Sequence, residues 1–283
     1  MSLVEFISDL SNPTLAFLPK ALLIALMSAI ICGAVGVHVV LRGLSFVGDA
    51  LAHAVFPGVA IAFVLQGSIL LGGAVAGGVV TILIAGFSQN RRLREDSIIG
   101  IFFAAAFALG LVIMSRVPGY TGSLESFLFG SLTGVSNTDI LTVAGIGALI
   151  LGVLALAHEK LVLVSVDRDF ARSIGMRVVL VDLVLYLTIA AAVVISVQTI
   201  GNILVLALLI APAAAARFLS DRVIPMMLIA PAIGGAAAFL GIWASWAWDL
   251  PTGASVVLAA ALIFILIWFF APKRGLIAGI IRR

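Results

Sequence analysis

Long apolar stretches, separated by short groups of charged residues, proline and glycine, dominate this chain of 283 residues. A helix needs about 20 mostly apolar residues to cross the hydrocarbon core of a bilayer. Hydrophobic residues make up 63% of the sequence and charged residues only 10%, which excludes an ordinary soluble enzyme. We therefore expect an all-α integral membrane protein with a single transmembrane domain over 1–283.

Nine apolar segments remain when the chain is cut where charge, Pro and Gly gather. Pro212 interrupts the short seventh segment, which is therefore compatible with a half helix as well as with a full span. We expect eight or nine transmembrane helices. The segments are 20–41, 46–66, 68–88, 97–117, 139–158, 178–199, 201–217, 223–248 and 252–271.

The basic residues predict the orientation, because Lys and Arg stay on the cytoplasmic side of short loops. With the N-terminus outside, only Lys20 and Arg116 of the 16 basic residues lie outside. On this topology 1–19 is an outer N-terminal segment and 272–283 is a cytoplasmic tail. No basic cluster precedes the first apolar segment, so we expect no cleavable signal and a chain that is used whole.

Two connections are too long to be simple turns. The outer one, 118–138, contains the apolar patch LESFLFGSL, which is too short to span and predicts a short helix at the outer face. The inner one, 159–177, is amphipathic and charged. Within it, 167–177 predicts a short interfacial or partner-docking helix, with Phe170 and Ile174 on one face.

Several catalytic motifs are absent from the sequence. No lysine follows a glycine, so the chain has no nucleotide-binding P-loop, and we expect ATP to be hydrolysed by a partner. His158 and Glu159 are not followed by the second histidine of a metalloprotease HExxH motif, and no GxSxG motif occurs. The single Cys32 excludes disulfides and cysteine metal clusters. We expect no permanently bound cofactor and, since membrane topology explains the basic residues, no nucleic-acid partner.

Ionisable residues inside membrane spans are costly and are therefore candidates for function. Asp49 and His53 stand four apart in the second segment, so one helical face presents a carboxylate and an imidazole. These ligands suit Mn²⁺, Fe²⁺ or Zn²⁺. Pro57 lacks the N–H that would bond the His53 carbonyl, which predicts a kink at Pro57 and Gly58 and a freed oxygen beside the site. A twofold dimer with this helix near its axis would supply two carboxylates and two imidazoles.

A structural interpretation of the same pair stays open, with Asp49 stabilising a helix dipole and His53 donating to a neighbouring carbonyl. Other candidates are weaker. His38 reads as a hydrogen-bonded core histidine, Asp182 as a helix-dipole carboxylate, Glu125 as an outer-loop acid and Asp249 as a turn residue. Trp243, Trp246 and Trp248 are typical of an aromatic belt at the membrane interface.

Residues 43–63, GLSFVGDALAHAVFPGVAIAF, resemble the permease of the bacterial ABC-type manganese, zinc and iron uptake systems, the ABC-3 family. That family's motif has the form L-S-x-x-G-D-A-L-S-H-A-V-L-P-G, from which Ala52 and Phe56 are mild departures. Residues 127–136, 167–178 and 198–222 also look like family segments, so the resemblance covers nearly the whole chain. The matching positions are Asp49, Ala50, Leu51, His53, Ala54, Val55, Pro57 and Gly58.

The resemblance implies a homodimeric permease with the type II architecture of vitamin B12 and siderophore importers, in a bacterial plasma membrane. It implies two cytoplasmic ABC ATPase subunits and an extracytoplasmic metal-binding lipoprotein as partners. By similarity, Asp49 and His53 would coordinate the metal in the pathway, and 167–177 would be the coupling helix that docks on the ATPase. The residues expected to serve that coupling are Asp167, Arg168, Phe170, Arg172 and Arg177.

We therefore expect the permease of an ATP-driven divalent metal importer. The oxygen ligands, the Asp49 carboxylate and the freed carbonyl of His53, favour Mn²⁺, and Zn²⁺ and Fe²⁺ remain possible. The sequence leaves two alternatives open. A proton-coupled secondary transporter would use Asp49, Asp182 or His53 as proton carriers, and an ABC permease for a siderophore or cobalamin would need a wide apolar tunnel.

Overall fold

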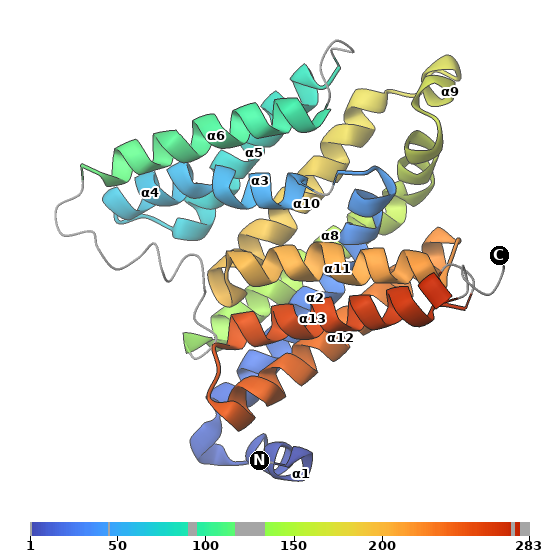
Figure 1. The fold of residues 1–283 in the computed structure, drawn as a ribbon. Helices are drawn as coiled ribbons and strands as arrows, with labels where there is room; N and C mark the ends of the chain where they lie inside the picture. Colours follow the sequence, from blue (N-terminus) through green and yellow to red (C-terminus); the bar gives the residue numbers. More distant parts are fainter. Residues whose placement is uncertain (1, 45, 90–94, 117–133, 273–274, 278–283) are drawn as a thin grey trace.

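The computed structural model describes residues 2–44, 46–89, 95–116, 134–272 and 275–277 (Figure 1). All regular elements in this part of the chain are helical, and within it nine helical segments are long and apolar enough to span a membrane. The structure thus agrees with the larger of the two expected counts. The spanning helices are α2 Phe17–Leu41, the pair α3 Val47–Ala54 and α4 Phe56–Val64, α5 Ile69–Phe87, α6 Glu95–Met114, α8 Asn137–Val166, α10 Val178–Ile200, α11 Asn202–Leu219, α12 Val223–Trp248 and α13 Thr252–Phe270.

Two segments differ from their sequence-based expectation. The seventh segment is one continuous helix, α11, with Pro212 buried inside it, so the half-helix alternative is wrong. Neighbouring helices support a proline-containing span in this way. The inner connection is shorter than predicted, because α8 continues from 159 to Val166. Glu159 and Lys160 are exposed, while Leu161 and Val164 pack inward. The charged residues therefore lie on the exposed face of α8 and do not end the helix.

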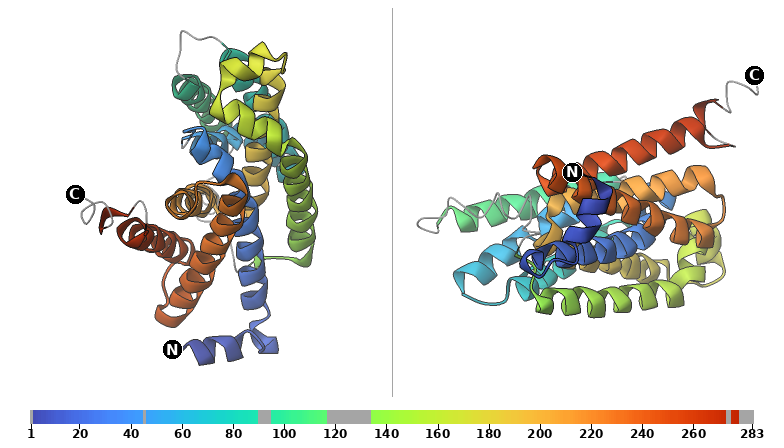
Figure 2. Two further views of the ribbon diagram at one scale, coloured as in Figure 1. Left: turned by 90° about the vertical axis from the view of Figure 1, so that its right-hand side faces the viewer. Right: turned by 90° about the horizontal axis from the view of Figure 1, so that it is seen from below.

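The helices form two groups that meet along α2 and α10 (Figures 1 and 2). One group holds α3, α4, α5 and α6 against α10, and the other holds α11, α12 and α13 against α2. Small residues permit the closest crossings. A Cβ at Gly36 would lie 1.8 Å from the carbonyl oxygen of Leu209 in α11, and a Cβ at Gly58 would lie 2.0 Å from that of Gly72 in α5. Such close approach is typical of helices that pack in lipid.

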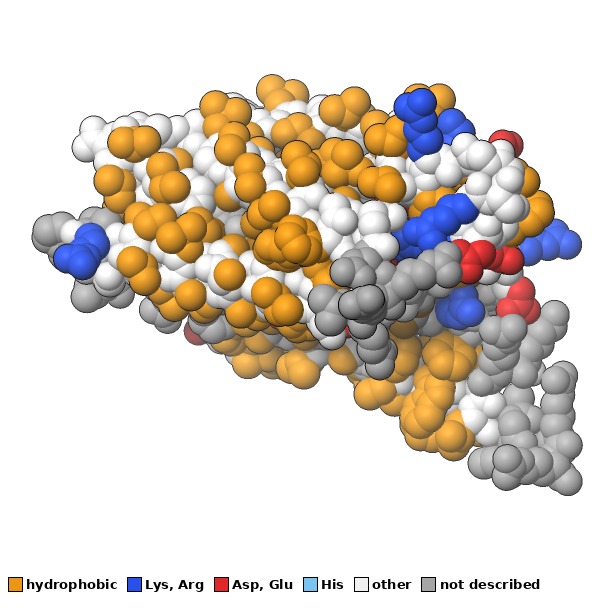
Figure 3. Space-filling model, turned by 90° about the horizontal axis from the view of Figure 1, so that it is seen from above, with side chains coloured by type: hydrophobic (Ala, Val, Ile, Leu, Met, Phe, Trp, Pro, Cys, Tyr) orange, Lys and Arg blue, Asp and Glu red, His pale blue; other side chains and the backbone are white. Residues whose placement is uncertain are grey.

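On the face shown in Figure 3, most basic side chains gather at one end of the molecule and hydrophobic side chains are spread over the remainder, with a basic side chain also at the opposite end. This end carries the C-termini of α2, α8 and α11, the N-termini of α10 and α12, and the short helix α9, Arg168–Ser173. Lys20 and Arg116 flank helix ends on the opposite side. The described basic residues at the first end are Arg42, Lys160, Arg168, Arg172, Arg177, Arg217 and Arg222.

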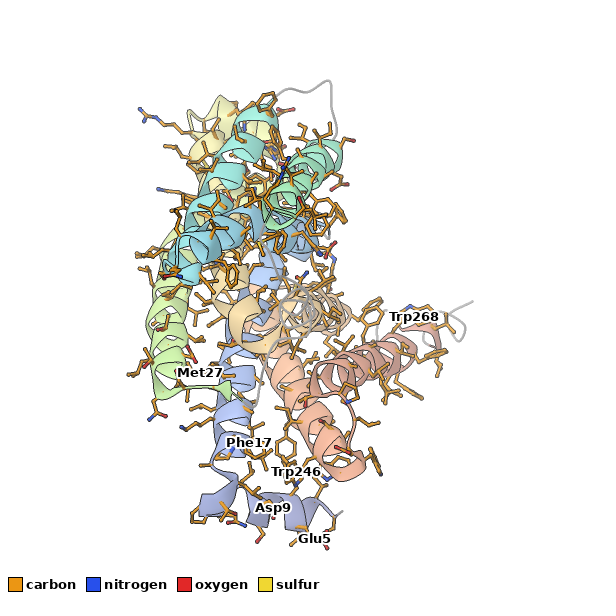
Figure 4. The ribbon with its side chains drawn as sticks, turned by 90° about the vertical axis from the view of Figure 1, so that its left-hand side faces the viewer. Glu5, Asp9, Phe17, Met27, Trp246 and Trp268 are labelled. Carbon is orange, nitrogen blue, oxygen red and sulfur yellow. The ribbon has the colours of Figure 1, made fainter. Side chains whose placement is uncertain are left out.

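The described part of the N-terminal segment, residues 2–19, is folded against the bundle. It contains α1, Leu3–Asp9, and a short 3-10 helix, Pro13–Leu15, and α1 lies across the ends of α2 and α12 (Figure 2). Phe6 of α1 is fully buried. The Nε1 of Trp246 donates a hydrogen bond to Asp9 Oδ2 at 2.9 Å, and the indole ring of Trp246 packs against Phe17 (Figure 4). Trp246 therefore connects α12 to α1. The sequence predicted only a position in an aromatic belt for this residue and not this contact.

Candidate functional site

Helix α3 buries all of its side chains except two. Asp49 and His53 are partly exposed, with side-chain exposures of 28% and 18%, while the other six positions of the helix are buried. Their spacing of four residues puts them on one face. The structure therefore keeps the carboxylate and the imidazole accessible on a helix that is otherwise enclosed by its neighbours.

The two side chains contact each other. His53 Nδ1 lies 3.0 Å from the backbone oxygen of Asp49 and 3.4 Å from its carboxylate Oδ1. Both atoms are hydrogen-bond acceptors, so Nδ1 is the nitrogen that carries the proton and donates. This assignment leaves the lone pair of Nε2 for a ligand, which is the arrangement that second-shell oxygens impose on metal-binding histidines.

The second span breaks beside this pair. Val55 separates α3 from α4, and Pro57 lies in the first turn of α4, where its missing N–H is tolerated. The sequence led us to expect the carbonyl of His53 without its i+4 donor, and the N–H of Val55, the residue that ends α3, donates to the carbonyl of Leu51 at 3.2 Å. Gly58 has a packing role, because its close contact with Gly72 lets α4 cross α5.

Aromatic rings and one amide surround the imidazole. Phe103 and Phe107 of α6 meet the His53 ring edge to face, with centroid distances of 5.4 and 5.2 Å. Asn202, the first residue of α11, brings its amide nitrogen to 3.2 Å from His53 Nε2. Sequence reasoning missed all three. A polar residue directly after Gly201 was the available signal for Asn202, whereas nothing in the sequence paired α6 with α3.

One copy of the chain provides an incomplete metal site. Among the described residues, no group of three or more His, Cys, Asp or Glu side chains could hold a metal ion. One carboxylate and one imidazole offer an oxygen and a nitrogen ligand for a divalent cation, and further ligands have to come from elsewhere. The partial exposure of Asp49 and His53 leaves them open to such groups.

The histidine expected in the core is buried but is not hydrogen bonded. His38 is fully buried in α2, and neither ring nitrogen has a partner among the described residues. Its ring meets that of His158 edge to face at 5.9 Å. The expected hydrogen bond is therefore wrong, while the core location is confirmed.

Asp249 ends α12 in a left-handed conformation, which confirms it as a turn residue.

A buried ion cluster ties α9 to the transmembrane helices. Asp182 of α10 is fully buried, and its two carboxylate oxygens lie 2.6 Å from Arg42 Nη1 and 2.5 Å from Arg168 Nη2. Arg168 also approaches Glu95 of α6 at 3.5 Å, and Tyr186 donates to the same Glu95 oxygen. Asp182, expected to act on a helix dipole, instead joins α2, α9 and α10.

The helix α9 occupies the middle of the segment predicted for coupling. Asp167 caps it by accepting from two backbone N–H groups, and Arg172 Nη2 donates to Gln89 Oε1 at the end of α5. Arg177 follows as the exposed residue before α10. Phe170 and Ile174 are 51% and 55% exposed. Two arginines thus face the protein's own helices, while two apolar side chains face outward.

Other predicted features lie outside the described residues. They are most of the outer connection 118–138 with Glu125, and most of the tail 272–283.

Comparison with known proteins identifies the family. The model of the ABC 3 transport family matches residues 14–271, which is nearly the whole chain. The chain belongs to this family. As an ABC-3 member it is the membrane-spanning permease component of an ABC transporter, which confirms the architecture and the transport class predicted from residues 43–63.

Named relatives of this ABC-3 permease agree with the assignment. The manganese transport system membrane protein MntC of Halalkalibacterium halodurans is 41% identical over 93% of this chain and 90% of its own length. The chelated iron transport system membrane protein YfeC of Yersinia pestis is 34% identical over 93% of this chain and 89% of its own. The solved structure of PsaBC from Streptococcus pneumoniae in complex with Fab superimposes with a TM-score of 0.85 at 34% identity, covering 96% of this chain and 98% of that one.

Proposed function

We propose that this ABC-3 permease passes a divalent metal ion from an extracytoplasmic binding protein to the cytoplasm. Mn²⁺ is the favoured ion, and Zn²⁺ and Fe²⁺ are the alternatives. The observation that carries the proposal is the accessible pair on α3, Asp49 and His53, whose Nε2 is free to bind a ligand. Relatives named for manganese and for chelated iron support a metal cargo. An oxygen and a nitrogen ligand at a partly exposed position suit an ion in transit, which must bind and also leave.

The functional unit in this proposal is a pair of permeases with two cytoplasmic ATPase subunits and a binding lipoprotein. A second copy facing α3 would double the ligands of one chain to two carboxylates and two imidazoles. The basic end of the molecule, which holds α9, faces the cytoplasm, and the N-terminus lies outside. Segment 118–138 receives the ion from the binding protein.

The exposed tip of α9 docks on the ATPase. Phe170 and Ile174 provide its apolar contact, and Arg177 and Asp167 lie beside it. The ion cluster around Asp182 then carries movement of α9 to α2, α6 and α10, because each of these helices contributes a charged partner. ATP binding on the partner would thereby change which side of the pathway is open.

Uptake of Mn²⁺ by the reconstituted assembly tests the site. We expect Asp49→Asn and His53→Ala to lower uptake by at least about tenfold, as loss of a metal ligand or its support does. The matched control is Asp139→Asn, which alters a carboxylate of the capping box at the start of α8. Normal uptake in both site variants would contradict the proposal.

The same vesicles test the other transport mechanisms. Uptake driven by a pH gradient in vesicles that contain the permease alone would establish a secondary transporter. Uptake of a siderophore or cobalamin without protection by Mn²⁺ would establish a different cargo. We expect neither, and we expect uptake to require the ATPase.

A further inference from the structure

Asn202 reaches the candidate cation site from a different helix than Asp49 and His53 do. The chain turns between α10 and α11 at Gly201, whose φ of +83° is a conformation that favours glycine. This turn sets Asn202 at the start of α11, where the residue is only 2% exposed. A polar side chain in such a position needs partners, because burying an amide without hydrogen bonds costs stability.

The amide lies over the face of the imidazole. Its nitrogen is 3.3 Å from His53 Nδ1 and 3.2 Å from Nε2. An atom in the ring plane at these two distances would overlap the carbon between the two nitrogens. The amide therefore stacks on the ring, and the in-plane lone pair of Nε2 stays free for a cation.

The other end of the same amide has no partner. Asn202 Oδ1 is buried and makes no hydrogen bond within the part of the chain that the structure describes. Rotation of the amide about its last bond exchanges the oxygen and the nitrogen at almost no change in shape. An unpaired carbonyl-type oxygen is thus available within a few ångströms of the His53 nitrogens.

We propose that Asn202 is a third ligand of the transported cation and supplies its oxygen beside His53 Nε2. This inference rests on the proposed function, because it assumes a cation at Asp49 and His53. With Asn202 included, each chain offers two oxygen ligands and one nitrogen. Amide and carboxylate oxygens are hard ligands, and adding one favours Mn²⁺ over metals that prefer nitrogen or sulfur.

A purely supporting role for Asn202 makes a different prediction. In that case the N–H groups of the amide, and not its oxygen, hold the ring. Asn202→Asp separates the two roles, since aspartate keeps the oxygen and removes the N–H donors at nearly constant shape. Asn202→Ala removes both groups.

The experiment measures the Mn²⁺ and Zn²⁺ concentrations for half-maximal uptake by the reconstituted assembly. For Asn202→Ala we expect the Mn²⁺ value to rise by about tenfold and the preference for Mn²⁺ over Zn²⁺ to fall. For Asn202→Asp we expect Mn²⁺ uptake at a half-maximal concentration no higher than that of the original protein. Asn12→Ala, at an exposed asparagine that also begins a short helix, is the control and should change neither value.

The thermal unfolding transition of each purified variant checks its folding, and the rise in unfolding temperature that Mn²⁺ produces measures its binding of Mn²⁺. A smaller rise for Asn202→Ala than for the original protein supports the ligand role even where the aspartate variant does not fold.

The inference fails if Asn202→Ala transports and binds Mn²⁺ normally while Asp49→Asn and His53→Ala do not, and the proposed function then still stands. It also fails if Asn202→Asp folds and is as impaired as Asn202→Ala. If all three sites tolerate substitution, the proposed function itself is wrong.

Discussion

At the scale of single residues, the clearest departure from sequence reasoning is Asp182. A carboxylate in the first turns of a helix is commonly explained by the helix dipole. In the structure it is fully buried between Arg42, which is 4% exposed, and Arg168. Removing one member of such a buried cluster is costly, because the remaining charges lose their partner inside a poorly solvated environment.

We predict that Asp182→Asn lowers the free energy of unfolding by about 3–5 kcal/mol. Thermal unfolding in detergent measures this change. Asp169→Asn is the matched control, since its carboxylate is 68% exposed and an ion pair at such a position contributes little. Equal stability of the two variants would contradict a structural role for the cluster.

At the scale of helices, close packing depends on particular glycines, and amino-acid composition does not indicate which glycines these are. Gly72 and Gly78 both lie in α5. A Cβ at Gly72 would come within 2.3 Å of the Gly58 carbonyl oxygen and 2.6 Å of the Ala62 side chain, whereas a Cβ at Gly78 meets nothing within 4 Å. Of these two glycines of α5, only Gly72 supports the crossing of α4 over α5, and with it the position of His53 next to α6.

We predict that Gly72→Ala destabilises the permease by about 1–3 kcal/mol, because α4 and α5 have to separate. Gly78→Ala should be neutral or slightly stabilising, since alanine is the better helix former. The unfolding temperatures of the two variants provide the comparison, and a greater loss for Gly78→Ala would contradict the close contact of α4 with Gly72.

The short helix α9 permits a second prediction at this scale. Replacing Phe170 and Ile174 by serine should leave the fold intact, because both side chains are more than half exposed. We expect loss of ATPase binding and of metal uptake, with the thermal stability of the permease unchanged. Co-purification of the ATPase measures the first effect. Retained binding would place the ATPase contact elsewhere on the basic end of the molecule.

At the scale of the whole molecule, a single chain leaves its candidate site open on one side. Phe46, Asp49 and His53 follow a helical spacing of three and four residues, and Phe46 is 42% exposed. A twofold partner on this side would both cover the apolar ring and complete the ligand set.

We predict that Phe46→Cys, made in a Cys32→Ala background, forms a covalent dimer with a short bifunctional thiol reagent in native membranes. Leu156→Cys is the control, because this residue is 89% exposed and lies on α8, which packs mainly against α2 and α10. Gel mobility distinguishes 29.3 kDa chains from pairs. Cross-linking at position 156 alone would place the dimer interface on α8.

Local properties were predictable from the sequence. Hydropathy alone located the spans, and the charge pattern correctly placed α9 within 167–177, because both signals are carried by neighbouring residues. Asp49 and His53 were found for the same reason, since one helical turn puts them together whatever the rest of the chain does. The length of α8 was underestimated, because charged residues at 158–160 resembled a boundary while the helix continued.

Contacts between distant segments were not predictable in this way. Asn202 lies 149 residues from His53, and Arg42 lies 140 from Asp182. Nearly uniform hydrophobicity around each span removes the amphipathic signal that would say which faces meet. The sequence by itself determined that this chain spans a membrane and carries one acid and imidazole pair within it. Only the tertiary structure decided what surrounds that pair and what holds α9, because helix partners in lipid are selected by close packing and buried charge, which no single segment encodes.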